Sequence, residues 1–438
     1  MKSESKYIFS KGDFTRSDFS IKFKNESGNF YLPIEKVKEL YCFNDVTIST
    51  KLLDILATAG IIVHFFNYYG NYIGTFYPKE NLISGRLIVK QVETFQNYRI
   101  EIAKAFVKGI AQNIKSILYH YYRHGVKEIK PVIDFCNKDV EKLLSKAKDI
   151  KQVLSVEGKI WAEFYDSFKF FLPEDFIINK RVKRPPDNPM NALISFGNTL
   201  LYTKTISEIY NTHLDQSISF LHEPSEARFS LSLDLSEVFK PVVVYKTIFD
   251  LVNNKKIKVE KHFNAKLNYS LLNDEGKKIF ISAFEDRLNQ TFEHPVLKRK
   301  ITYKHAIRLD GYKLIKFITE GKEFIPFDIE KRNRRGETEE FSNMAKNINY
   351  NYVFLFYDVG VKRVNKVFKK CKKYLNHWQK SVFRGPLTNS EILELENELK
   401  KIINKEEDFI SIIKIMDFKK IGETTLGTAD KNTEDIFI

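Results

Sequence analysis

The sequence predicts a multidomain α+β protein: an N-terminal β domain, an all-helical domain and a small C-terminal ferredoxin-like domain of β-α-β-β-α-β order. At 438 residues the chain is too long for one ordinary domain. Hydrophobic residues make up 43% and aromatic residues 14% of it, which is enough to fill hydrophobic cores. The apolar pattern is strand-like at first, helical from about residue 86, and alternates between the two after residue 348.

Residues 1–85 are expected to form the β domain. Strand-like alternation mixed with turns occurs in "NFYLPIEKVKELYCFNDVTIS". Two strands joined by a turn are predicted for "GIIVHFFNYYGNYIGTFYP", where Gly70 and Gly74 mark the turn. His64 lies inside this apolar run, and we interpret it as a core histidine rather than a ligand.

Residues 86–330 are expected to form the helical domain. Apolar positions recur every three or four residues, with basic residues between them, in "GRLIVKQVETFQNYRIEIAKAFVKGIAQNIKSILYHYYR". Three prolines in "KRPPDNPMN" predict that one helix ends there and that the next begins at about Asn191, which we interpret as its cap.

A linker is predicted for residues 331–348, because "EKRNRRGETEEFSNMAKN" is polar and charged. Residues 349–438 follow with the strand "YNYVFLFYDVG", which contains Asp358, then a basic helix, a strand in "HWQKSVFRG", a helix and a last strand. This order is typical of a ferredoxin-like domain. Met344 stands where a separate protein would start, so the chain resembles two proteins joined into one.

The composition indicates a polyanionic partner and a reducing compartment. Lys and Arg number 71 against 56 Asp and Glu, a formal net charge of +15, which favours nucleic acid. A lysine-rich surface from a compositional bias explains the charge equally well. The three cysteines are far apart and fit neither a disulfide framework nor a zinc site. Without a signal peptide or a long apolar run, the protein is expected to be soluble and cytoplasmic, with no membrane partner.

Polar residues with chemical potential are crowded into "FLHEPSEARFSLSLDLSEVFKP". Asp234 and Glu237 share one face if this segment is helical. A solvated helix surface is the ordinary explanation of such a pair. Here the flanking residues are mostly Leu, Val and Phe, so the pair should be buried, and buried carboxylates need a cation or several hydrogen-bond donors.

A third carboxylate, Glu157, occurs in "VLSVEGKIWAEFYDSF", just before Gly158, where we expect a helix to start. Alone it is an ordinary helix-N-terminal Glu. Two carboxylates and the imidazole of His222 would suit Mg²⁺ or Mn²⁺, with open positions for water and a phosphate oxygen. No cysteine or second histidine lies near enough in sequence to favour zinc. Such a site in a basic protein favours phosphodiester chemistry.

Four stretches, "SVEGKIWAEFY", "PPDNPMNALISFGNTLLY", "SFLHEP" and "LSLDLSEVFKP", resemble the CRISPR-associated spacer-acquisition integrase family, Cas-one. The resemblance covers about residues 5–330 and is strongest to the type I-B integrases. It implies one metal ion in the helical domain, with Glu157, His222 and Glu237 as catalytic ligands and Asp234 as their acidic neighbour. The family often has Gly where "SFLHEP" has Ser.

Residues 349–420 resemble the family's small partner, Cas-two, in "YVFLFYDVGVKRVNKVFKKCKKYL", "WQKSVFRGPLTNSEILELENELKKII" and "EEDFISIIKI". The resemblance places that family's strand-end Asp, linked to a metal-dependent nuclease site across a dimer, at Asp358. It also implies that the tail after about residue 418 crosses to a neighbouring subunit. Four integrase subunits act with each small-subunit pair in that family, so a four-chain fusion carries two extra small domains.

These observations predict a CRISPR adaptation integrase fused to its small partner. Its partners would be double-stranded DNA with 3′-OH ends, the CRISPR repeat DNA, and other copies of itself through integrase and small-domain dimers. Two alternatives stay open: a metal-dependent endonuclease on branched or single-stranded DNA, and a non-catalytic DNA-binding scaffold. The basic residues that are candidates for phosphate contacts are Arg86, Lys90, Lys104, Lys108, Lys180, Arg181, Lys183 and Arg184.

Overall fold

The computed structural model describes residues 4–79, 84–178, 180–183, 185–224, 228–266, 269–294, 297–330, 352–404 and 407–415. The chain forms two compact units, residues 1–334 and 335–438, which are described separately. The predicted linker, the predicted crossing tail and Arg184 lie outside the described residues.

The first strands build two four-stranded sheets. One sheet has the order β1-β5-β7-β8, in which β1, β5 and β7 are parallel and β8 is antiparallel to β7; the other has the order β4-β3-β2-β6. The strands are β1 (Glu4–Ile8), β2 (Gly12–Ser17), β3 (Ser20–Asn25), β4 (Gly28–Pro33), β5 (Val37–Cys42), β6 (Val46–Ile48), β7 (Ile62–Phe66) and β8 (Tyr72–Phe76). The β prediction is confirmed, with one helix added, α1 (Thr50–Thr58), followed by Gly60 at φ 65°.

Strand β5 is buried on both faces and joins the sheets to the helices. Leu40 and Cys42 pack into the core of the β sheets, whereas Tyr41 packs into the larger helical core. On the helical side, the fully buried ammonium of Lys204 lies 2.8 Å from Glu39 Oε1 and 2.7 Å from Glu285 Oε1. The β sheets and the helical region belong to one compact unit, so the domain boundary expected at residue 85 stays a prediction.

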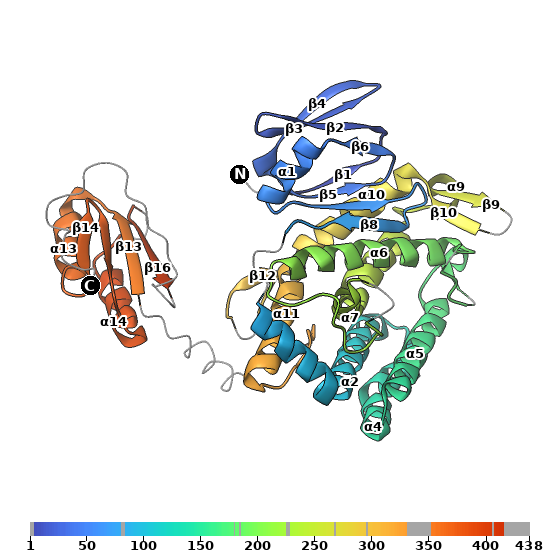
Figure 1. Ribbon diagram of the computed structural model, residues 1–438. Helices are drawn as coiled ribbons and strands as arrows, with labels where there is room; N and C mark the ends of the chain where they lie inside the picture. The colour runs from blue at the N-terminus through green and yellow to red at the C-terminus, as the bar shows by residue number, and fades with distance from the viewer. Residues whose placement is uncertain are drawn as a thin grey trace. The chain divides into compact units, whose positions relative to one another are not determined.

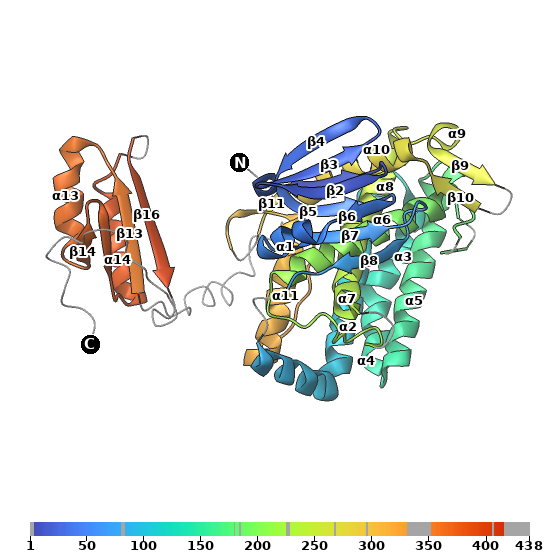
Figure 2. The ribbon, with the colours of Figure 1, turned by 45° about the horizontal axis from the view of Figure 1, so that its top comes forward.

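The region from residue 86 onward is mainly helical, as predicted. The helices are α2 (Gly85–Arg123), α3 (Lys130–Asp134), α4 (Val140–Lys146), α5 (Ile150–Asp166), α6 (Pro189–Tyr210), α7 (Ser230–Phe239), α8 (Lys246–Asn253), α9 (Val259–His262), α10 (Asp274–Asn289) and α11 (Tyr303–Glu320). Two hairpins were not anticipated: β9 (Phe263–Lys266) with β10 (Tyr269–Leu272), and β11 (Thr291–Glu293) with β12 (Lys300–Thr302). Helix α6 runs between the sheets and helices α2, α5 and α7 (Figures 1 and 2).

The prediction of Asn191 as a helix cap was wrong. Helix α6 begins at Pro189, and its cap is Asn188, whose side chain accepts a hydrogen bond from the backbone N–H of Asn191. Pro189 favours the first helical position because it has no N–H to leave unpaired. Asn191 is therefore already inside the first turn, where its side chain is fully buried and accepts a hydrogen bond from Arg181.

Helix α7 packs between α2 and α6 and is buried on nearly its whole circumference. It continues into a short π-helical segment, Lys240–Tyr245. Pro241 lies in this segment, and its missing N–H cannot supply the α-helical hydrogen bond. The central position of α7 places its two acidic residues in the interior of the helical part.

The second unit confirms the ferredoxin-like order. Its elements are β13 (Tyr352–Asp358), α13 (Val361–Cys371), β14 (Asn376–Gln379), β15 (Val382–Gly385), α14 (Asn389–Lys400) and β16 (Phe409–Ile415). The sheet has the order β14-β15-β13-β16 with antiparallel pairing throughout. The stretch first interpreted as one strand, "HWQKSVFRG", is a hairpin, in which Lys380 takes a positive φ of 42°.

Two further expectations concern the chain as a whole. The three cysteines are free and buried. Within the described ranges, no helix is both long and apolar enough to cross a membrane.

Candidate metal centre

The carboxylates of Asp234 and Glu237 lie one helical turn apart on α7. Asp234 is 0% exposed and Glu237 is 4% exposed. The prediction that this pair is buried, rather than part of a solvated helix surface, is confirmed. Each carboxylate therefore needs partners inside the protein.

Asp234 finds its partners in the loop before α7. Its Oδ2 accepts hydrogen bonds from the backbone N–H groups of Phe220 (2.6 Å) and Leu221 (2.8 Å). Its Oδ1 accepts from the backbone N–H of His222 at 3.0 Å and lies 2.8 Å from that residue's ring Nδ1. With Nδ1 held as the donor, the neutral ring keeps its lone pair on Nε2, the atom that can bind a metal ion.

The imidazole of His222 is partly accessible, with 22% of its side chain exposed. Burial alone would lower the pKa of His222, but the hydrogen bond and charge of Asp234 raise it above the ordinary value. The carboxylates of Glu237 and Glu157 act in the same direction. These interactions bring the residues of three separate segments into one electrostatic cluster.

Glu157 lies in the middle of α5, so its predicted place at a helix start was wrong. The helix begins at Ile150, and the side chain of Asp149 caps it by accepting from the N–H of Gln152. Trp161, one turn after Glu157, donates its indole N–H to Glu157 Oε1 at 2.7 Å. Burial raises the pKa of Glu157, and the neighbouring carboxylate of Glu237 raises it further.

A lysine compensates the two glutamates. Lys240, three residues after Glu237, forms an ion pair with Glu237 Oε1. Its charge also acts on Glu157, where it opposes the effect of burial on the pKa. The ammonium thus lies close enough to influence both carboxylates that were predicted as metal ligands.

The donor set fits a hard divalent cation, although the side chains are not arranged around one. Among the described residues, no three His, Cys, Asp or Glu side chains lie in positions ready to hold an ion. Glu237 is turned toward Lys240 and Glu157 toward Trp161. Two carboxylates and one imidazole are nevertheless the donors that Mg²⁺ or Mn²⁺ takes in proteins. We conclude that the residues fit such an ion once the two glutamates leave their present partners.

Arg181, a candidate DNA contact, is held by the protein itself. Its guanidinium donates to Asn191 Oδ1 at 3.0 Å and to Ser195 Oγ at 2.9 Å. Asn191 also donates to the carbonyl of Lys180 at 2.9 Å. These contacts fix the start of the basic segment before α6. The charge of Arg181 also lowers the pKa of Tyr165, which burial raises overall to about 12.

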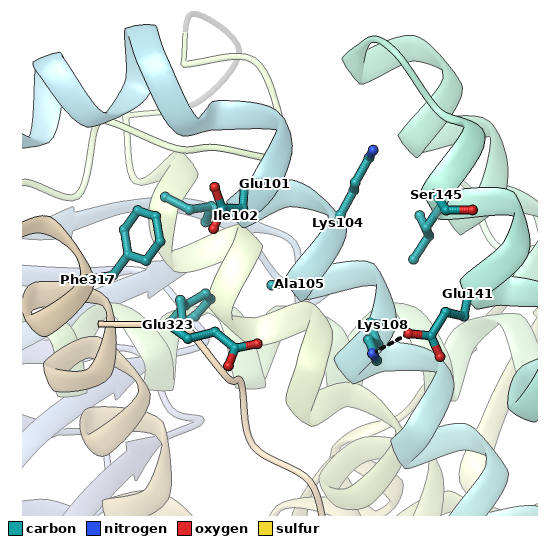
Figure 3. Close-up of a pocket in the computed structure, with 11 residues that line it drawn as sticks. Glu101, Ile102, Lys104, Ala105, Lys108, Glu141, Ser145, Phe317 and Glu323 are labelled. Atoms are coloured by element: carbon teal, nitrogen blue, oxygen red, sulfur yellow. Dashed lines mark hydrogen bonds and ion pairs between the residues drawn. The ribbon is translucent and has the colours of Figure 1, made fainter. Parts of the chain in front are cut away.

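The other candidate phosphate contacts differ in their surroundings. Arg86, Lys180 and Lys183 are exposed, and Lys90 is half-buried. Lys104 and Lys108 line a surface hollow of about 250 Å³ between α2, α4 and the segment after α11 (Figure 3).

Three glutamates share that hollow with the two lysines. Lys108 Nζ lies 2.8 Å from Glu141 Oε1, and Glu101 and Glu323 also line it. The local charge is therefore mixed, which makes this surface a poorer match to DNA than the exposed basic residues.

Asp358 ends β13, as predicted, and its side chain is exposed. The nearby loop is held by Asp408, which accepts hydrogen bonds from Arg363 and from the backbone N–H of Gly360. In the described part of this unit, Asp358 belongs to no group of three His, Cys, Asp or Glu side chains that could hold a metal ion. Its metal-binding role stays a prediction.

Three residues around the site were missed from the sequence. Trp161 and Lys240 stand four and three residues after the glutamates they contact, so helical spacing could have identified them. Arg99 was missed as well. It belongs to α2 and contacts the loop of His222 from more than 120 positions away, which no local pattern indicates.

Comparison with known proteins identifies relatives of both units. The family model for "CRISPR associated protein Cas1" matches residues 6–286, and that for "CRISPR associated protein Cas2" matches residues 351–420. A Cas1 protein of Methanobrevibacter ruminantium is 44% identical over 331 residues, which is 75% of this chain and 99% of that protein. A CRISPR-associated endonuclease Cas1 of Thermodesulfovibrio yellowstonii is 40% identical over 327 residues, covering 74% and 98%.

Solved structures give the same result. A Cas1 protein from Thermotoga maritima matches with a TM-score of 0.65 and 37% identity, covering 72% of this chain and 97% of that one. A casposase bound to its integration product also has a TM-score of 0.65, covering 80% of this chain and 99% of that one. Its identity is 19%, so this second likeness concerns the fold alone.

Proposed function

Because the chain belongs to the Cas1 family of CRISPR-associated proteins and carries a Cas2 domain after it, we propose that it inserts captured double-stranded DNA into a CRISPR array. The chain is a CRISPR-associated endonuclease and integrase of spacer acquisition. The observation that carries the proposal is the electrostatic cluster of the buried Glu237 with the partly buried Glu157 and His222, whose donors match a hard divalent cation.

The proposed reaction is a transesterification. The 3′-hydroxyl of the fragment attacks a phosphodiester at the repeat boundary, a new phosphorus–oxygen bond forms, and the bond to the displaced 3′-oxygen breaks. The hydroxyl proton leaves the attacking oxygen and a proton reaches the displaced one, so no bond energy from a nucleotide is needed. Bound Mg²⁺ or Mn²⁺ would polarise the phosphoryl group and stabilise the leaving oxygen.

The protein's own residues would prepare this step. Asp234 holds the His222 ring so that Nε2 presents a lone pair to the ion. Glu157 and Glu237 would supply oxygen ligands after release from Trp161 and Lys240. Lys240, once released from Glu237, would offer a cation near the two glutamates that could balance the negative charge of a phosphate. The exposed Arg86, Lys180 and Lys183 would contact DNA phosphates.

The open face of the C-terminal sheet supports self-association of the small domain. Helices α13 and α14 pack on the face that carries Leu355 and Phe383, both fully buried. On the opposite face Phe354 pairs with Ile413, which is 51% exposed, and the neighbouring Phe409 is 63% exposed. An aromatic sheet face of this kind is a typical docking surface for a second copy. Such pairs would bridge integrase dimers across the captured DNA.

We also propose that the chain is a type I-B-like integrase, because the stretches around Glu157 and His222 resemble those proteins. We propose that it acts in the cytoplasm, where an integrase meets chromosomal DNA. The buried free cysteines accord with a reducing compartment.

An integration assay with defined DNA ends tests the proposal. Ala at Glu157, His222 or Glu237 should each abolish joining of a labelled fragment to repeat DNA in Mn²⁺, while duplex binding in a gel-shift assay stays within about threefold of wild type. Duplex binding depends on Lys and Arg contacts rather than on these side chains.

The two alternatives give different results in the same assay. Cleavage without joined product would indicate the nuclease, and duplex binding by the wild type with neither cleavage nor joining would indicate a non-catalytic scaffold. Full joining activity in all three variants would show that these residues do not form the catalytic centre. Each of these outcomes would overturn the assignment.

A further inference from the structure

An arginine on α2 holds the loop that carries His222. We propose that Arg99 is a positioning residue for the metal centre: it fixes the backbone of residues 219–223 so that the imidazole of His222 meets the ion in one orientation. This inference rests on the proposed function, because it takes His222 as a ligand.

The guanidinium binds the carbonyl side of the loop. Arg99 Nε donates to the backbone carbonyl of Phe220 at 3.0 Å, and one terminal NH₂ donates to the carbonyl of His222 at 3.3 Å. The same terminal group is 2.8 Å from Glu223 Oε1. The guanidinium also lies over the ring of Phe95, 4.8 Å from its centroid, and only 18% of the side chain is exposed.

Asp234 binds the opposite, N–H side of the same loop, through the three backbone donors described above. Ser219 adds a hydrogen bond from its hydroxyl to the carbonyl of His222 at 2.8 Å. The loop is therefore held from two sides: the carboxylate of Asp234 accepts hydrogen bonds from its N–H groups, and the guanidinium of Arg99 donates to its carbonyl groups. Neither alone fixes both sides of the peptide planes.

The forked shape of the guanidinium explains why an arginine stands here. Its separate N–H groups reach two carbonyls and one carboxylate at once, whereas a lysine ammonium is a point donor that cannot span the same set. Phe220 is fully buried, so its carbonyl has no ready access to replacement water once Arg99 is removed. A shift of this loop moves His222 directly, since the residue belongs to it.

Helix α2 also holds the loop further upstream. Gln91, two turns before Arg99, donates to the carbonyl of Asp215 at 2.8 Å and accepts from its N–H at 3.1 Å. Residues spaced by eight lie on the same helical face. One face of α2 thus holds the segment from Asp215 to Glu223 at both of its ends through side-chain hydrogen bonds.

The test compares Arg99→Ala, Arg99→Lys, His222→Ala and a control, Arg123→Ala, in the full chain. Arg123 is exposed near the end of the same helix, where its guanidinium lies over Tyr119. Two quantities are measured: the Kd for Mn²⁺, from the electron paramagnetic resonance signal of the free ion, and hydrogen exchange of the amides of residues 220–222.

We expect Arg99→Ala to weaken Mn²⁺ binding about 10- to 100-fold, the usual effect of removing a group that orients a ligand. Exchange of the three amides should accelerate at least tenfold. Arg99→Lys should give intermediate values in both measurements, and Arg123→Ala should match wild type. A purely electrostatic role would instead let Arg99→Lys behave as wild type, which would overturn the proposal.

The failures of the two proposals are distinguishable. If wild type binds no Mn²⁺, or His222→Ala binds it as tightly as wild type, the metal-centre assignment fails; the exchange data then decide whether Arg99 orders the loop. If wild type binds and His222→Ala does not, while Arg99→Ala is unchanged in both measurements, the inference on Arg99 fails alone. Should Arg99→Ala not fold, Arg99→Lys decides, and wild-type values for it refute the role.

Discussion

Replacing Asp234 with Asn changes a single oxygen into an NH₂ group and should disable the site through its neighbours. Both carboxylate oxygens are in use: Oδ2 accepts two backbone N–H groups, and Oδ1 accepts one together with the ring of His222. An amide has one acceptor oxygen, so an NH₂ group at the Oδ2 position faces two backbone N–H donors, and one at the Oδ1 position faces the backbone N–H of His222. At about 1–3 kcal/mol for each unsatisfied buried group, the unfolding free energy should fall by about 1–3 kcal/mol with the NH₂ group against the ring and by about 2–6 kcal/mol in the other orientation.

The chemical consequence follows from the ring. With the NH₂ group against Nδ1, the imidazole of His222 is favoured in the tautomer that accepts there, which places its proton on Nε2 and removes the lone pair that a metal ion needs. We therefore expect Mn²⁺ affinity to fall about 10- to 100-fold, with integration lost in proportion.

Calorimetric titration measures the affinity, and urea unfolding measures the stability. Fluorescence of Trp161 reports on the first unit once Trp378 is replaced by Phe. Asp250→Asn is the matched control, because this half-exposed carboxylate pairs only with Lys246 among the contacts described here. Wild-type Mn²⁺ affinity in folded Asp234→Asn would refute the reasoning about the tautomer.

Three further predictions concern other parts of the chain. Burial lowers the pKa of His64 from 6.5 to about 3, so only the unfolded chain takes up this proton between those values, and stability falls as pH drops from 6.5 toward 3. Between pH 7 and pH 5 His64 should contribute about 2 kcal/mol to this loss, and His64→Gln should reduce the difference between the two pH values in urea unfolding by that amount; an unchanged difference would contradict it. Asp358→Ala should retain integration that Glu157→Ala loses, and equal loss in two folded variants would show that the second unit is catalytic for joining. The double variant Phe409→Glu with Ile413→Glu places negative charge on the open sheet face and should prevent two small domains from pairing there. We expect the mass of the DNA-bound particle to fall below that of the four chains expected for wild type. An unchanged mass would exclude this face as the contact between small domains.

Local patterns predicted the elements well where burial follows from neighbours in sequence. The acidic pair of α7 could be placed in the interior because Leu, Val and Phe flank it. The same reasoning misplaced Glu157, since Gly158 suggested a boundary. Glycine costs only about 1 kcal/mol inside a helix, and the burial of Val153 and Ile160 on the core face of α5 outweighs it.

Contacts between distant segments were beyond the reach of the sequence. Arg99 looks like any other basic residue of an amphipathic helix, and its role depends on a loop that folds back from more than 120 residues later. The hairpin of β14 and β15 was missed for a local reason: its turn at Lys380 contains no Gly, Asn or Asp, the residues that usually signal a positive φ. Arg181 stays a candidate DNA contact, but nothing in the chain around it reveals Asn191 and Ser195 as partners of its guanidinium.

The buried contact of Lys204 with Glu39 and Glu285 bears on how the protein can change shape. Swinging the sheet away from α6 would leave the buried carboxylate of Glu39 without its counter-charge, and breaking a buried pair in that way costs about 3–5 kcal/mol. All residues of strand β5 except Lys38 are buried, so sliding of the strand would also disrupt the packing of its side chains. The sheets and the helices around α6 should therefore move as one rigid body.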